Sequence, residues 1–225
     1  NVGIVVEDTD AVDFDSGSGG SPVTYTAGRS VLGASENLRE KLIAFAGELL
    51  NCAPEQLTSA DGRVKQNLPE GQQPQEIPLA ELAARAADAA RGPLLGENSF
   101  TAPTSTVTSF CTQTAEVEVD QETGQVKVTK IVSVHDVGTV INPLTHQGQI
   151  EGGVIQGLGY ALMEELTTEE GRISSLSLGD YKLPTIQDLP ELVTRLIGSP
   201  SGPAPYDSKG IGESSNVPVA AAIAN

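Results

Sequence analysis

The spacing of apolar side chains predicts two helices in the first half of the chain. Apolar residues recur every three or four positions over residues 27–50, as on the buried face of an amphipathic helix. That stripe consists of Leu38, Leu42, Phe45 and Leu49. Pro78 stands where the first turn of a second helix accepts a proline. The stripe of this second helix consists of Leu79, Leu82, Ala86 and Ala90.

Alternation of apolar and polar residues predicts a β-hairpin in the middle of the chain. The segment TAEVEVDQETGQVKVTKIVSV alternates on both sides of a turn at Asp120–Gly124. Val117 and Val119 lead into this turn, and Val126 and Val128 lead out of it. This is the clearest strand signal in the sequence.

Weaker strand signals complete the expected fold. Residues 2–6 are typical of a buried strand, and residues 52–77 suit a small exposed hairpin that turns at Asp61-Gly62. Residues 174–185 are expected to form a strand that ends at Pro184. Neither a repeat nor a long linker divides the sequence. We therefore predict an α+β fold, a single compact unit of mixed sheet with packed helices.

The helix expected after Gln147 is unusually rich in glycine. Five of the twelve residues from Gly148 to Gly159 are glycine, and each costs about 0.5–1 kcal/mol in a helix interior relative to alanine. One face of this helix collects Gln149, Gly152, Gly153, Gln156 and Gly157. Such a bare face suits a flat polar ligand or the close packing of another element. The pattern does not choose between these two uses.

A second glycine-containing segment, TYTAGRS, leads into the first helix. Backbone N–H groups near Ala27, Gly28 and Arg29 would face outward at the positive end of the helix dipole, which is a geometry that binds anions. Taken alone, these residues are explained better by an ordinary capped helix start.

The third segment, KGIGE, comprises residues 209–213. Gly210 and Gly212 are expected to let the backbone turn sharply and to expose Glu213 at the start of a final helix. A carboxylate on so uncluttered a loop could act as a general base, or it could only complement the helix dipole.

Composition narrows the classes of function. The net charge of −17 argues against nucleic acid and against an anionic membrane surface, and no apolar run reaches the ~18 residues of a membrane span. Cys52 and Cys111 form no C-x-x-C pair, which favours reduced thiols in a cytoplasmic protein. His135 and His146 are too few for the usual zinc site. Any metal would therefore arrive within an organic cofactor, and His135 is expected to be structural.

The ordered set of segments resembles the cofactor subunit of the molybdenum hydroxylases, the xanthine dehydrogenase and aldehyde oxidase family. The segments are TYTAGRS, HDVGTVINP followed by GQIEGGVIQGLGYALMEE, DYKLPT, and KGIGE. The resemblance covers essentially the whole chain but only the C-terminal part of that subunit. Residues 1–225 are thus identified as the C-terminal part of a molybdenum-cofactor-binding domain, a fragment truncated at both ends.

The resemblance implies an oxidoreductase that hydroxylates an aldehyde or an N-heterocyclic carbon with oxygen derived from water. Its cofactor is molybdopterin with molybdenum, and a cytosine dinucleotide form is left open. Glu213 would be the general base toward the hydroxyl ligand of the metal, and no side chain of this sequence would ligate the metal. The implied cofactor contacts are Ala27, Gly28, Arg29, Gln149, Gly152, Gly153, Lys209, Gly210 and Gly212.

Further modules would complete such an enzyme. The resemblance implies the rest of the molybdenum subunit, iron–sulfur and FAD modules that receive electrons, and a small-molecule substrate, and it leaves a homo-oligomer open. Because part of the family's pocket comes from elsewhere in the subunit, we expect the fragment alone to be inactive and to bind the cofactor weakly. The alternative is a non-catalytic scaffold or assembly relative of the same fold. The presence of Glu213 with both loop glycines argues against that alternative.

Overall fold

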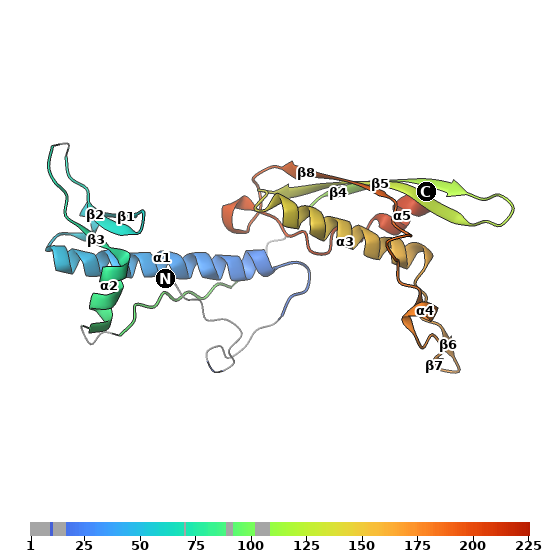
Figure 1. Cartoon of the computed structure of the whole chain (residues 1–225), viewed down its shortest axis with the longest axis horizontal. Coiled ribbons are helices and arrows are strands. Elements are labelled where there is room, and N and C mark those ends of the chain that lie inside the picture. Colours follow the sequence, from blue (N-terminus) through green and yellow to red (C-terminus); the bar gives the residue numbers. More distant parts are fainter. Residues whose placement is uncertain (1–9, 11–16, 70, 89–91, 102–108) are drawn as a thin grey trace. The chain divides into compact units, whose positions relative to one another are not determined.

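A computed structural model describes residues 10, 17–69, 71–88, 92–101 and 109–225. These residues form helices and mixed sheet (Figure 1), so the predicted α+β class is confirmed. The strand expected at residues 2–6 and the last residue of the second stripe, Ala90, lie outside the described residues. None of the helices in the described part is long and apolar enough to cross a membrane.

The contacts divide the chain into two compact units, where a single unit was expected. One unit contains the described residues from Ala27 to Thr101, and the other contains Ser18–Thr26 and the described residues from Ser109 to Asn225. Each unit has its own apolar cluster, and no buried residue is shared between the two clusters. Two separate cores explain the division, because burial of apolar surface is what holds a unit together.

The first unit is built on the long helix α1. Its elements are α1 (Val23–Leu50), the 3-10 turn Pro54–Gln56, β1 (Leu57–Ala60), β2 (Arg63–Gln66), β3 (Glu76–Pro78) and α2 (Leu79–Ala86). The first four residues of α1, up to Thr26, belong to the second unit. β1 and β2 form the expected hairpin, in which Asp61 and Gly62 both have positive φ as a tight hairpin turn requires. The prediction that this hairpin is exposed is wrong, because Leu57 and Val64 are buried in the apolar cluster. Phe45 of α1 packs on this small sheet together with Leu82 of α2.

The second unit contains a three-stranded sheet in the order β4-β5-β8. Its elements are β4 (Cys111–Val119), β5 (Val126–Gly138), α3 (Pro143–Leu162), β6 (Thr168–Glu169), β7 (Arg172–Ile173), α4 (Leu178–Tyr181), β8 (Glu191–Gly198), the 3-10 turn Pro205–Asp207 and α5 (Val219–Ala224). β4 and β5 form the predicted hairpin, whereas β8 pairs with β5 in parallel, a pairing that the sequence reading missed. A parallel neighbour needs a long crossover, and α3 lies within it (Figure 1).

One face of this sheet is covered by α3 and α5. The buried cluster consists of Val128, Ile131, Val137, Ile150, Val154, Leu158, Val219 and Ile223. The same face of β5 also carries Ser133 and His135, which are 2% and 1% exposed. The face is therefore apolar at Ile131 and Val137 but polar at Ser133 and His135, which lie between them.

The strand predicted over residues 174–185 is wrong. Leu178–Tyr181 form a single helical turn, α4, because the Oγ of Ser177 accepts a hydrogen bond from the N–H of Asp180 at 3.2 Å. The apolar side chains that suggested alternation are exposed: Leu176 is 83% exposed and Leu178 is 68% exposed. Nothing buried selects the strand conformation.

The last helix also begins later than expected. Ser214 and Ser215 do not start it; residues 212–218 form a series of turns, and α5 begins at Val219. Pro218 explains the delay, because it lacks the N–H that would bond to the carbonyl of Ser214 in a helix. Glu213 is therefore not at the N-terminus of a helix, and the helix dipole does not act on it.

Candidate functional site

The loop that carries Glu213 is attached to the end of β5. Gly138 and Ser208 form an isolated bridge, and the N–H of Lys209 donates to the carbonyl of Val137 at 3.0 Å. Gly138 has φ +64°, and a methyl group there would lie 2.4 Å from the carbonyl oxygen of Asp207. Only glycine fits this crossing, so the loop starts from a defined point on the sheet.

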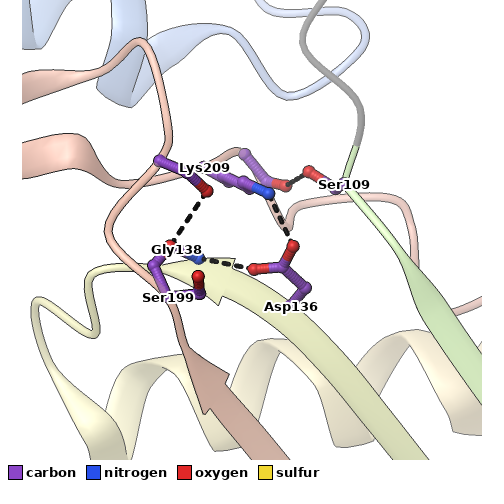
Figure 2. A network of polar contacts seen from close by, with 7 residues as sticks. Ser109, Asp136, Gly138, Ser199 and Lys209 are labelled. Carbon is purple, nitrogen blue, oxygen red and sulfur yellow. Dashed lines mark hydrogen bonds and ion pairs between the residues drawn. The ribbon is translucent and has the colours of Figure 1, made fainter.

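A buried ion pair strengthens this attachment. Lys209 Nζ lies 2.6 Å from Asp136 Oδ2, and the two side chains are 6% and 19% exposed (Figure 2). The hydrogen bond from Lys209 lowers the pKa of Asp136 below its ordinary value; burial opposes this shift, and the N–H of Gly138 contributes to it. The ammonium of Lys209, which was predicted to contact the cofactor, is thus paired with the sheet.

The two loop glycines permit a close approach of Ser21. A methyl group at Gly210 would lie 2.6 Å from the carbonyl oxygen of Ser21, and one at Gly212 would lie 2.9 Å from its Oγ. Neither glycine has a positive φ, so the backbone conformation does not by itself require glycine at these two positions. Their role is to leave room for the segment just before α1.

Part of the glycine-rich face of α3 is used for close packing, which is one of the two uses that the sequence left open. A methyl group at Gly153 would meet the Oγ of Ser215 at 2.0 Å, and one at Gly157 would meet Val219 at 2.6 Å. These two glycines let α3 pack closely on the segment after Glu213. In contrast, a methyl group at Gly152 would meet no atom within 4 Å.

Two cavities flank the point where this loop meets α3. The first has a volume of about 350 Å³ and is lined by Ser18, Ser21, Val23, Thr24, Ile141, Thr145, His146, Gln149, Ser208, Lys209, Gly210, Ile211 and Gly212. The second, of about 440 Å³, is lined by Gly148, Gln149, Gly152, Gly153, Ile155, Gln156, Glu164, Leu183, Pro184 and Gly212. Gln149 and Gly212 belong to both, and Gln149 Nε2 donates to the carbonyl of Gly212 at 2.9 Å.

The start of α1 contributes to the first cavity. Val23 and Thr24 line it, and N–H groups in the first turn of a helix have no acceptor within the helix. The predicted contacts at Ala27, Gly28 and Arg29 lie further along. Because α1 begins at Val23 rather than at residue 27, their N–H groups belong to the regular helical hydrogen bonds. These three residues are in the first compact unit, and their role remains a prediction.

Glu213 is held by its backbone while its side chain is exposed. Its N–H donates to the Oγ of Ser21 at 3.1 Å, and its carbonyl accepts from the N–H of Asn216 at 3.4 Å. Glu213 is not among the residues that line either cavity, whereas its neighbour Gly212 lines both. The carboxylate therefore stands on a fixed backbone beside the junction of the two cavities.

Sequence reasoning missed the residues behind this loop. Ser109, Cys111 and Gln113 all donate hydrogen bonds to its backbone carbonyls. The sequence did contain a signal for two of them: Cys111 and Gln113 occupy inward positions of β4, and the next inward residue is Ala115. Burial raises the pKa of the Cys111 thiol, which therefore stays protonated and able to donate.

The chemistry of the second cavity fits a flat, polar heterocycle. Gly148 and Gly152 expose bare backbone to it, so a planar group can approach the main chain. Gln149 and Gln156 add amide groups that can both donate and accept hydrogen bonds. Gln156 Oε1 accepts from Asn216 Nδ2 at 3.1 Å, which fixes this amide beside the cavity.

Comparison with known proteins places these features in a family. A family model described as a molybdopterin cofactor-binding domain matches residues 1–190. The putative xanthine dehydrogenase molybdenum-binding subunit of Escherichia coli K12 is 34% identical over an alignment of 228 residues, which covers 99% of this chain and 30% of that protein. The nicotine 6-hydroxylase large subunit of Paenarthrobacter nicotinovorans is 34% identical over 94% of this chain and 26% of that protein.

A solved structure shows the same relationship. Quinoline 2-oxidoreductase from Pseudomonas putida 86 superposes with a TM-score of 0.77 at 32% identity, over 92% of this chain and 27% of that one. The chain thus spans less than a third of the length of each of these relatives.

Proposed function

This chain belongs to the family of molybdopterin cofactor-binding domains, and from that premise we propose that it contributes one wall of the cofactor site of a molybdenum hydroxylase of the xanthine dehydrogenase type. One observation carries the proposal: the glycine-bearing face of α3 and the loop of Glu213 meet at two cavities that share Gln149 and Gly212. Such a junction suits a planar pterin that lies along the main chain.

The residues of this chain divide the work between binding and proton transfer. Gln149 and the exposed backbone at Gly152 hold the pterin, and the loop from Lys209 to Gly212 borders it. When bound, the cofactor supplies a molybdenum centre that accepts two electrons while oxygen from water is added to the substrate. The carboxylate of Glu213 takes the proton that this addition releases, which is the task of a general base. Its exposed side chain lets it reach outward from the loop.

The names of two similar proteins support a proposal for the substrate class. Nicotine 6-hydroxylase and quinoline 2-oxidoreductase are named for N-heteroaromatic compounds. An electron-poor ring carbon beside nitrogen is open to attack by an oxygen nucleophile, as is the carbon of an aldehyde. We therefore assign to the complete enzyme the hydroxylation of an N-heterocyclic or aldehyde carbon.

The complete enzyme needs parts beyond this chain. Similar proteins are named as subunits, which supports an assembly in which iron–sulfur and flavin modules receive the electrons. Cys52 and Cys111 are both free thiols, as in proteins of a reducing compartment. This supports a cytoplasmic location for the assembly.

The replacement Glu213→Gln in the full-length, cofactor-loaded enzyme tests the proposal. Glutamine keeps the shape but cannot take up a proton, so turnover should fall by at least 100-fold, in line with the ~10²–10⁴-fold contribution of a general base. Molybdenum content should stay within error of the parent enzyme. Glu122→Gln, in the exposed turn between β4 and β5, is the matched control and should change neither quantity. Unchanged turnover in Glu213→Gln would favour the scaffold alternative.

A further inference from the structure

The inward-facing side of the start of β4 carries three hydrogen-bond donors in a row. Ser109, Cys111 and Gln113 are spaced two residues apart, and each is partly buried while Phe110, Thr112 and Thr114 between and after them are exposed. Alternate residues of an extended chain share one side. The row therefore faces the interior of the second unit, where apolar side chains would be usual.

Each member of this row donates to a backbone carbonyl of the loop that carries Glu213. Ser109 Oγ donates to the carbonyl of Gly210 at 3.1 Å (Figure 2). Cys111 Sγ donates to the carbonyl of Ser214 at 3.4 Å. Gln113 Nε2 donates to the carbonyl of Ser215 at 2.7 Å. The three contacts bracket Glu213, with one on its N-terminal side and two on its C-terminal side.

Gln113 is itself held by a hydrogen bond to a side chain of β5. Its Nε2 also donates to the Oγ of Ser133 at 3.0 Å, and Ser133 Oγ lies 2.7 Å from Nε2 of His135. Ser133 and His135 are almost fully buried. The Nε2 of Gln113 is therefore held between two acceptors, Ser133 Oγ and the carbonyl of Ser215, which makes it a rigid support rather than a loose contact.

The position of the loop depends on these contacts because α5 does not supply them. The carbonyls of Ser214 and Ser215 precede α5 and receive no hydrogen bond from the start of that helix. Pro218 has no N–H to donate to the carbonyl of Ser214. The N–H of Val219 donates to the carbonyl of Asn216 instead of that of Ser215. Side chains of β4 take the place of the missing helical bonds. Without these hydrogen bonds, the carbonyls of Ser214 and Ser215 would no longer be held in place.

We propose that Ser109, Cys111 and Gln113 are positioning residues for Glu213: they hold the loop from both sides so that the carboxylate keeps one place relative to the bound substrate. The inference rests on the proposed role of Glu213 as the base. Misplacement of a reacting group by about 1 Å can cost about 100-fold in rate. The row therefore affects turnover through Glu213 rather than through cofactor binding.

The replacement Gln113→Leu in the full-length, cofactor-loaded enzyme tests this proposal. Leucine removes the donor to Ser215 and keeps a similar size. We expect kcat to fall about 10- to 100-fold, with KM and molybdenum content within about twofold of the parent. Amide hydrogen exchange of the peptide covering residues 209–217 should become about tenfold faster or more. Thr114→Val, on the opposite side of the same strand, is the control and should leave all four quantities unchanged.

A double variant separates positioning from a general structural effect. If Gln113 acts through Glu213, Gln113→Leu should lower kcat no further in an enzyme that already carries Glu213→Gln. A full additional loss would overturn the proposal. So would unchanged exchange of residues 209–217, or faster exchange with unchanged kcat.

A second pair of variants keeps the test decisive if Gln113→Leu does not fold. Cys111→Ser keeps a donor to the carbonyl of Ser214 and should retain kcat, whereas Cys111→Ala removes it and should lower kcat and speed exchange. Equal behaviour of these two variants would refute the proposal. If Glu213→Gln alone leaves turnover intact, the proposed function fails. The exchange measurements would still show whether the row holds the loop, so the two failures are distinguishable.

Discussion

The replacement Gly153→Ala would place a methyl group 2.0 Å from the Oγ of Ser215 and 3.2 Å from its Cβ. Ser215 is fully buried, so its hydroxyl has little room to move aside. Either α3 or the segment after Glu213 must therefore shift. Overpacking of this kind costs about 1–3 kcal/mol. The higher helix propensity of alanine offsets about 1 kcal/mol of that cost.

The neighbouring replacement Gly152→Ala is a matched comparison. A methyl group there meets no atom within 4 Å, so only the gain in helix propensity remains. Because both variants share that gain, the difference between them isolates the overpacking, about 1–3 kcal/mol. Amide hydrogen exchange in α3 measures local opening and should be about 5- to 100-fold faster in Gly153→Ala than in Gly152→Ala.

Equal exchange in the two variants, within about twofold, would refute the close packing of α3 on Ser215. The cofactor proposal predicts the opposite order for molybdenum content in the full-length enzyme. Gly152 lines the second cavity with bare backbone, and a methyl group there stands where the pterin would lie. Gly152→Ala should therefore lose cofactor while keeping a stable helix.

Three further predictions concern stability and binding. Burial lowers the pKa of His135, so as the pH falls below about 6.5 this histidine is protonated in the unfolded chain before it is protonated in the folded chain. The contribution of neutral His135 to stability is therefore fully present above that pH. Below it, the free energy of unfolding measured by chemical denaturation should decline by up to about 1.4 kcal/mol per pH unit. Lys209→Met leaves the partly exposed Asp136 without its hydrogen-bonded cation and should lower the free energy of unfolding by about 1–3 kcal/mol. The isolated chain spans less than a third of the length of its relatives. By elemental analysis it should therefore retain far less than one molybdenum atom per chain.

Each of these predictions has a control that can contradict it. His135→Gln should remove the decline between pH 6.5 and 5, and parallel profiles for the two proteins would show that another group titrates. Lys127→Met, on the exposed part of β5, should change stability little. A stoichiometric amount of molybdenum in the isolated chain would show that this chain alone forms a sufficient site.

Sequence patterns predicted the hairpins and turns, because these elements are determined by residues that are close together in the chain. The hairpin of β4 and β5 follows from alternation around Asp120–Gly124, and the turn at Asp61-Gly62 follows from residues that accept positive φ. β8 was missed because its partner is β5, which lies more than fifty residues earlier in the chain. A parallel pairing leaves no turn signature in the sequence.

The site was only partly predictable for a similar reason. Spacing placed Gln149 and Gly152 on one face of α3, and both line the second cavity. The same spacing grouped Gly153 with them, and Gly153 also lines this cavity, but a methyl group there would collide with Ser215. Periodicity shows which residues share a face, but the neighbour of each residue depends on tertiary packing. The exchange comparison of Gly152 and Gly153 tests that distinction directly.

The polar end of the β4–β5 sheet shows how stability and geometry compete at this site. Gln113 Oε1 and Ser215 Oγ are buried without a partner among the described residues, and such groups cost about 1–3 kcal/mol each. Apolar side chains at these positions would pack more favourably, but burial of apolar surface has no direction and would not orient a carbonyl. Hydrogen bonds are directional, so a row of donors can fix the loop of Glu213 where an apolar row could only cover it. If an apolar replacement of Gln113 raised the free energy of unfolding and lowered turnover, it would show this competition between stability and geometry most clearly.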